Sequence, residues 1–192
     1  MKNSFIFHII VSLFLISCSS KNLSNEEVEL HNFKSIFFNV YDYKMVLEDE
    51  SFNMPSYLGF EKTFLLKELT DWGNKKFKVT GKQNSLSLII NDFSLEKKDI
   101  KKYKGLKKIF FSEEKVEYNL KLELSLNFTD KDNVSSVLNL NGNISFFIDD
   151  SHSIRKKRKF LLASYYELIK KMDKTLEKEI NKETFSKFIT NL

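Results

Sequence analysis

The strongest constraint on the fold is an unbroken alternation of apolar and polar residues over residues 116–128. This period of two is that of a β-strand with one dry and one solvated face, as in an antiparallel sheet covered on one side. The alternation returns over residues 138–148, after turn-forming residues at 129–133. The sequence therefore predicts a long antiparallel hairpin over residues 116–148. The alternating apolar residues of its first strand are Val116, Tyr118, Leu120, Leu122, Leu124, Leu126 and Phe128.

Two segments show a helical period instead. In residues 60–72, Leu65, Leu69 and Trp72 recur at steps of four and three, and Gly73 follows where a C-cap is expected. A longer helix is predicted from about Arg155 to Ile180, and a short one over residues 183–189. The apolar stripe of the long helix is formed by Leu161, Tyr165, Leu168, Met172, Leu176 and Ile180.

Further strands are predicted over residues 34–43, 77–81 and 85–93, with a lysine-rich connection over 97–108. The dry face of the hairpin needs a cover, and the amphipathic helices need a sheet. We therefore expect an α+β fold, an antiparallel sheet of about four to five strands with two helices packed on one face.

The chain has 192 residues and is 42% hydrophobic, with 19 Phe and 7 Tyr, which indicates a packed globular domain. We expect three parts: a signal peptide over residues 1–17, a polar tether over 18–32, and one domain over 33–192. Loss of Lys2 with the signal peptide lowers the net charge from +5 to +4. This mild surplus is nearly all lysine, which lacks arginine's bidentate fork, so we expect no nucleic-acid partner.

The N-terminus carries an export signal. Lys2 precedes an apolar run over residues 5–16, which is too short to span a membrane. The sequence Leu15-Ile16-Ser17-Cys18 resembles the lipobox of bacterial lipoproteins, in which the cysteine is acylated and becomes the first mature residue. The alternative is an ordinary secretory signal with an incidental cysteine. Ser19 and Ser20 follow, and by analogy with enteric sorting we expect a lipid-anchored protein of the outer membrane that faces the periplasm.

Residues for catalysis or metal binding are scarce. Acylation of Cys18, the only cysteine, would leave no thiol for a disulfide or a metal. Only His31 and His152 follow the signal peptide, and both lie in polar segments, so a catalytic histidine is not expected. The acidic turn at residues 130–133 lacks the glycine and glutamate of a calcium loop. We expect no catalytic residue, metal or cofactor, and hence no enzyme.

Two basic segments are the candidate contact surfaces. Lys101 and Lys102 lie in the lysine-rich connection, and Arg155 and Arg158 lie in the basic run 155–159. These side chains are candidates for contact with anionic headgroups or an acidic partner, against the alternative of a solvated surface. Five cations at a helix start oppose the helix dipole. Either the chain accepts this placement or the helix begins later, near Lys159.

The order of elements resembles that of small bacterial envelope lipoproteins. The shared pieces are Leu69 and Gly73 of the first helix, strands at 77–79 and 89–93, and the helix at 161–180. The chain looks like the lipopolysaccharide-assembly lipoprotein and the auxiliary lipoproteins of ABC-type and intermembrane lipid transport, and is similar to uncharacterised alphaproteobacterial lipoproteins. The resemblance implies a non-enzymatic accessory role beside an envelope protein partner. The alternative is a periplasmic lipid- or glycan-binding chaperone with an apolar pocket.

Overall fold

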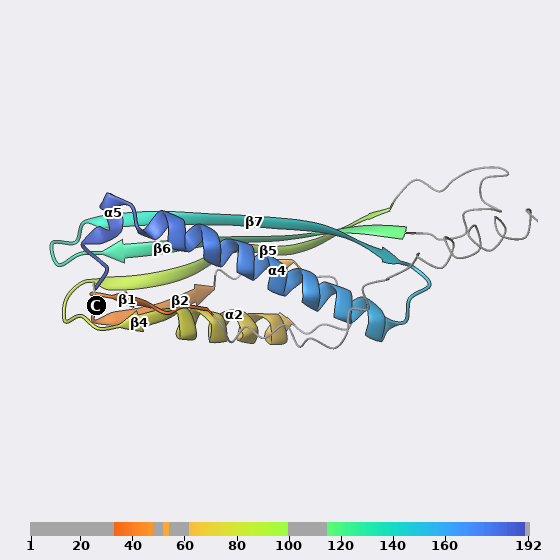
Figure 1. The fold of residues 1–192 in the computed structure, drawn as a ribbon, viewed down its shortest axis with the longest axis horizontal. Coiled ribbons are helices and arrows are strands. Elements are labelled where there is room, and N and C mark those ends of the chain that lie inside the picture. Colours follow the sequence, from red (N-terminus) through yellow and green to blue (C-terminus); the bar gives the residue numbers. More distant parts are fainter. Residues whose placement is uncertain (1–32, 48–51, 54–61, 100–114, 191–192) are drawn as a thin grey trace, which may run out of the picture.

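The computed structural model describes residues 33–47, 52–53, 62–99 and 115–190, which form an elongated molecule (Figure 1). Among these residues, no helix combines the length and the apolar character needed to cross a membrane. The elements in chain order are β1 (Ile36–Phe38), β2 (Asp42–Leu47), β3 (Phe52–Asn53), α2 (Lys62–Lys76), β4 (Phe77–Val79), β5 (Ser85–Asp99), β6 (Lys115–Thr129), β7 (Ser135–Asp149), α4 (Ile154–Ile180) and α5 (Glu183–Ser186).

The main sheet has the strand order β2-β5-β6-β7, and β3 also pairs with β5. Strands β5, β6 and β7 are antiparallel and 15 residues long each, so the predicted hairpin is confirmed as β6 and β7. Helices α2 and α4 cover one face of this sheet, and the predicted α+β class is confirmed. One detail differs from the prediction, because β2 and β3 run parallel to β5.

The two faces of the sheet differ as the alternation predicts. The even-numbered residues of β6 from Val116 to Phe128 are all buried against the helices. The opposite face is polar. On it the Asn91 amide donates to Ser125 Oγ at 2.6 Å, and Ser125 Oγ donates to Asn139 Oδ1 at 2.8 Å. These bonds tie β5, β6 and β7 together on the face that no helix of the described residues covers.

The alternation of β5 changes register at a β-bulge. Leu86, Leu88 and Ile90 face the helices, and the pairing with β6 shifts between Ile90 and Asp92. The extra residue, Asn91, lets Phe93 return to the buried face, where it is fully covered. The strand continues to Asp99, so Lys97 and Lys98 belong to β5 and not to the connection predicted after it.

Helix α2 lies close above β2 and β5. The prediction that Gly73 caps this helix is wrong, because α2 continues through it to Lys76. A Cβ at Gly73 would lie 2.5 Å from Tyr43 Oη and 3.5 Å from a methyl carbon of Leu88. The glycine is therefore needed for the close approach of the helix to the sheet, not for a turn.

The single strand predicted over residues 34–43 is split in two. β1 pairs in parallel with β4 as a separate two-stranded sheet, whereas β2 joins the main sheet. The C-terminal segment closes the other side of β1: the Asn39 amide donates to the Phe188 carbonyl, and the Thr190 amide donates to the Phe37 carbonyl, both at 2.8 Å. The chain thus leaves one sheet and enters the other at residues 39–41.

A buried charged cluster joins α2 to α4. Lys76 is fully buried, and its Nζ lies 2.8 Å from both Asp173 Oδ1 and Glu177 Oε1. The Trp72 indole also donates to Asp173 Oδ1, at 3.3 Å. Burial raises the pKa of Asp173, and Lys76 opposes that rise. The cluster fixes how the two helices sit against each other over the sheet.

Candidate functional site

The basic run at the start of α4 is the strongest candidate site that the sequence predicted. The helix begins at Ile154, so the alternative of a later start near Lys159 is wrong. All five cations of residues 155–159 lie in the first two turns. Ser153 is the N-cap, and its side chain accepts a hydrogen bond from the Lys156 amide at 3.4 Å.

Acidic residues before the helix offset part of this charge. Lys157 Nζ lies 2.9 Å from Asp150 Oδ1, and the hydrogen bond from Lys157 lowers the pKa of Asp150. Asp149 accepts from the amide and the hydroxyl of Ser151 and so stabilises the turn that leads into α4. Carboxylates before a helix N-terminus also favour the dipole. The unfavourable basic start is thus stabilised locally, with Arg155 and Arg158 on the exposed surface.

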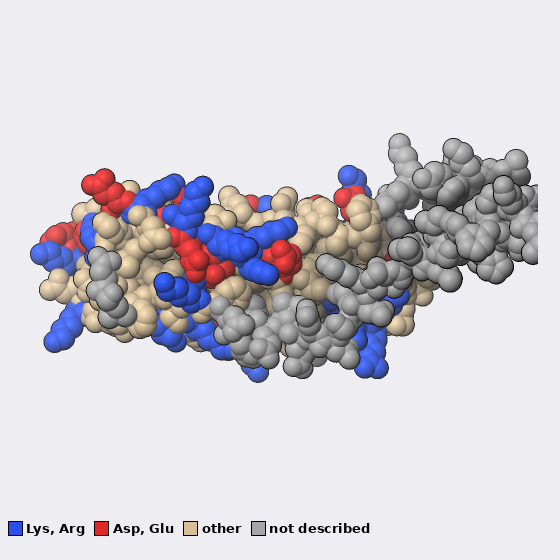
Figure 2. Space-filling model, viewed as in Figure 1, with Lys and Arg blue, Asp and Glu red and all other residues tan. Residues whose placement is uncertain are grey.

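The exposed side of this helix start forms an open hollow of about 520 Å³. Its lining residues follow a spacing of one, three or four, so they share one helix face. Apolar surface comes from Ile154, which is 62% exposed, and from half-buried Leu162. Figure 2 shows basic side chains at this end of α4, and mixed charge farther along the helix. The lining residues are Ile154, Arg155, Arg158, Lys159 and Leu162, and we call this surface the basic hollow.

The structure places only part of the predicted site. Arg155 and Arg158 come together in the basic hollow, whereas Lys101, Lys102 and Cys18 lie outside the described residues. Ile154 and Leu162 were not predicted as neighbours of the cations. The signal was present, because residues 154, 158 and 162 recur at steps of four.

His152 lies in the turn before α4 and contacts the helix, although its polar surroundings in the sequence did not predict this. Its ring stacks on Phe160 with centroids 5.7 Å apart, and its Nε2 lies 2.8 Å from Lys156 Nζ. Both contacts hold the turn before α4 against the helix. His31, the other histidine considered in the sequence, lies outside the described residues.

A second open hollow, of about 630 Å³, lies on the polar face of the main sheet. Its lining is mostly charged and amide side chains, among them Glu96, Lys98, Glu117 and Asn143. An apolar-ligand chaperone would need an enclosed apolar cavity. Neither hollow is of that kind, so the two give no support to the pocket alternative.

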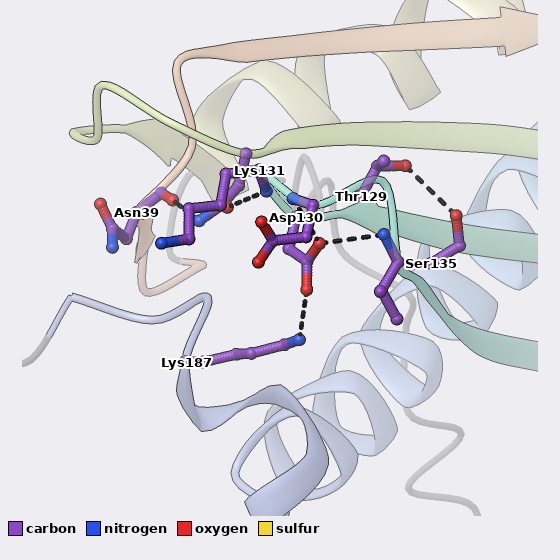
Figure 3. Close-up of polar contacts among 9 residues, drawn as sticks. Asn39, Thr129, Asp130, Lys131, Ser135 and Lys187 are labelled. Carbon is purple, nitrogen blue, oxygen red and sulfur yellow. Dashed lines mark hydrogen bonds and ion pairs between the residues drawn. The ribbon is translucent and has the colours of Figure 1, made fainter.

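The acidic turn between β6 and β7 has a structural role (Figure 3). Asp130 Oδ1 accepts from the amides of Asp132 and Val134, both at 2.9 Å, and Asp130 Oδ2 lies 2.8 Å from Lys187 Nζ. The bond from Lys187 lowers the pKa of Asp130. Asn84 accepts from the Lys131 amide at 3.0 Å. The turn therefore ties the hairpin to the C-terminal segment and to the loop before β5.

No protein-family model matches the chain, and no curated protein matches it. Solved structures of three bacterial lipoproteins are similar to it. Rare lipoprotein B from Shewanella oneidensis is 16% identical with a TM-score of 0.37, over 73% of this chain and 96% of that one. A minor lipoprotein from Acinetobacter baumannii is 10% identical with a TM-score of 0.39, over 79% and 96%. Lipoprotein GNA1162 from Neisseria meningitidis is 8% identical with a TM-score of 0.25, over 67% and 99%.

Proposed function

We propose that this chain is a non-enzymatic, lipid-anchored accessory protein of cell-envelope assembly or transport, attached through Cys18. We further propose that it contacts anionic headgroups, or an acidic envelope partner, through the basic hollow. The observation that carries this proposal is the position of Arg155, Arg158 and Lys159 beside the apolar surface of Ile154 and Leu162.

The chemistry of the basic hollow suits an anionic membrane surface. Guanidinium groups bind phosphate and carboxylate groups in bidentate geometry, and each basic residue near an anionic surface adds about 1 kcal/mol. Ile154 is exposed at the very start of the helix, where an apolar side chain gains from entering a lipid interface. A protein tethered at its N-terminus would hold this surface close to the membrane. Lys101 and Lys102 are proposed as further contacts on the same grounds.

Charge reversal in the basic hollow should weaken binding to anionic vesicles. The substitutions Arg155→Glu and Arg158→Glu together should reduce binding to phosphatidylglycerol vesicles at least tenfold, at about 1 kcal/mol for each cation lost. The measurement is vesicle co-sedimentation with a Cys18→Ala background, so that no acyl chain contributes. Salt should weaken binding of the parent, because the Debye length is about 8–10 Å at 0.1–0.15 M.

A matched control exists on the same helix. Lys170 and Lys174 are exposed on α4 outside the basic hollow, and Lys170→Glu with Lys174→Glu changes the net charge by the same amount. This control should keep most of the binding. Equal losses in both double variants would show that net charge and not the basic hollow governs binding, and no loss in either would refute the membrane contact.

Loss of Cys18 should abolish acylation of the protein. The Cys18→Ala variant should appear in the soluble periplasmic fraction, or remain unprocessed in the inner membrane, because thioether acylation needs the cysteine sulfur. Metabolic labelling with a clickable fatty acid measures this directly. Labelling that persists in the alanine variant would show that another residue carries the lipid and would refute Cys18 as the acylation site.

A further inference from the structure

Among the described residues, the outer edge of β7 has no strand partner. β7 is the last strand in the order of the main sheet, and in the described part of the chain no strand pairs with its outer side (Figure 1). A strand edge presents a row of N–H and C=O groups to solvent, and proteins usually protect it with lysine, proline or short length. β7 is 15 residues long, contains no lysine, arginine or proline, and has a single charged residue, Asp149, at its end.

The sequence of β7 is nearly symmetric about Gly142. Each residue from one to five positions before this glycine matches, in chemical class, the residue at the same distance after it. In an antiparallel pair of two identical strands centred on Gly142, polar residues would therefore face polar residues and apolar residues would face apolar ones. The matched pairs are Asn141 with Asn143, Leu140 with Ile144, Asn139 with Ser145, Leu138 with Phe146, and Val137 with Phe147.

Two exposed apolar residues fit the same symmetry. Val137 is 51% exposed and Phe147 is 54% exposed, although both lie on the polar face of the sheet. They stand five residues before and five residues after Gly142. A second strand centred on Gly142 would place Val137 of one copy opposite Phe147 of the other, twice, and would cover part of the apolar surface of both.

Helix α4 covers one half of β7 more fully than the other. It crosses the sheet obliquely, so that its C-terminal part lies over β7 and its start lies toward α2 (Figure 1). Leu138 and Leu140 are accordingly buried, whereas Ile144 and Phe146 are only half-buried. In the symmetric pair these half-buried residues lie opposite the buried pair of the other copy, beside the C-terminal half of its α4.

We propose that β7 is a homodimer interface, with two copies of this chain paired antiparallel about a two-fold axis at Gly142. Such an interface is isologous, since the same surface of each copy meets its mate. Pairing residues 137–147 of both copies forms about ten to twelve backbone hydrogen bonds. The axis stands perpendicular to the sheet, so the helices of both copies cover the same face of one continuous sheet.

Disulfide cross-linking tests the register. Asn139→Cys and Ser145→Cys are exposed positions that face each other in this dimer, with Cβ atoms about 4.5–5.5 Å apart. Mixing the two full-length single variants in mild detergent should give a heterodisulfide on oxidation. Either variant alone should not give its own dimer through the new cysteine, because six residues along the strand separate identical positions by about 20 Å. The parent chain controls for Cys18, its only native cysteine.

Charge at the two exposed apolar positions tests the interface. Val137→Lys with Phe147→Lys places like charges opposite each other and should weaken the dimer about tenfold or more. Tyr41→Lys with Val79→Lys adds the same charge at exposed apolar residues outside β7 and should leave the dimer unchanged. The readout is the mass of the full chain in detergent by light scattering over a concentration series. A monomeric parent, a dimer that survives the β7 lysines, or cross-links of equal yield in single and mixed samples would overturn the proposal.

Discussion

Replacing Lys76 with methionine should lower the free energy of unfolding by about 3–5 kcal/mol, the usual cost of removing one partner from a buried ion pair. The loss arises at Asp173, which is 5% exposed and would keep only the Trp72 indole as hydrogen-bond donor among its contacts described above. Urea unfolding of the parent and the variant at neutral pH measures it. Lys67→Met, at an exposed position of the same helix, is the matched control and should change stability by less than about 0.5 kcal/mol.

Two further measurements, the pH dependence and a second substitution, distinguish the cost of an unpaired Asp173 charge from the cost of lost packing at residue 76. Desolvation raises the pKa of Asp173, and the hydrogen bond and positive charge of Lys76 lower it. Without Lys76 the pKa of Asp173 should therefore rise further. The native state then binds more protons than the unfolded state, so the deficit of the variant should grow as the pH rises from about 4 and shrink below it. Asp173→Asn added to Lys76→Met should recover most of the loss, since the amide oxygen can still accept from Trp72. An equal deficit at pH 4 and 7, with no recovery, would point to lost packing instead.

Leu122→Ala should destabilise the protein by about 2–5 kcal/mol, the range for a buried leucine truncated to leave a cavity. Leu122 is fully buried in the middle of β6, with Phe93 opposite it on β5 and Gly142 opposite it on β7. Gly142 has no side chain of its own, and Leu168 and Met172 of α4 pack over it, so the loss depends on how far these two side chains can shift into the cavity. The measurement is urea unfolding, with the slope against denaturant compared to that of the parent.

Val134→Ala is the control for this truncation. Val134 is 55% exposed in the turn before β7, so its shortening should change stability by less than about 0.5 kcal/mol. Similar losses at the two positions would mean that Leu122 is not part of the packed core and that the alternation in β6 does not separate a dry face from a wet one.

The sequence predicted the elements whose pattern is regular over many residues. The alternation over residues 116–128 and the apolar stripe from Leu161 to Ile180 depend only on which face is buried, and both are confirmed as β6 and α4. Irregular features could not be predicted in this way. The bulge at Asn91 adds one residue to an otherwise alternating strand, and the break between β1 and β2 depends on pairing with β4 and residues 188–190.

Prediction of the candidate site was limited by tertiary contacts. Arg155 and Arg158 stand out in the sequence because they are the only arginines, and the helical spacing brings them together. Gly73 was assigned to a cap because a glycine after an apolar stripe usually ends a helix. Its role is to admit Tyr43 from a strand that is 30 residues away in sequence. Lys76 and Asp173 are nearly 100 residues apart in the sequence, and no local sequence pattern predicts that they pair.

The closure of β1 by the C-terminal segment sets the order in which the fold can be completed. β1 lies near the beginning of the described domain, yet one of its two neighbours is formed by residues 188–190, so the pairing joins residues about 150 positions apart. Phe188 also stacks on Phe128, with ring centroids 4.9 Å apart. Before the chain is complete as far as Thr190, β1 therefore lacks one of its two neighbours, and the aromatic core lacks Phe188. Closure of β1 must therefore await residues 188–190, and pairing over such a long sequence separation slows folding.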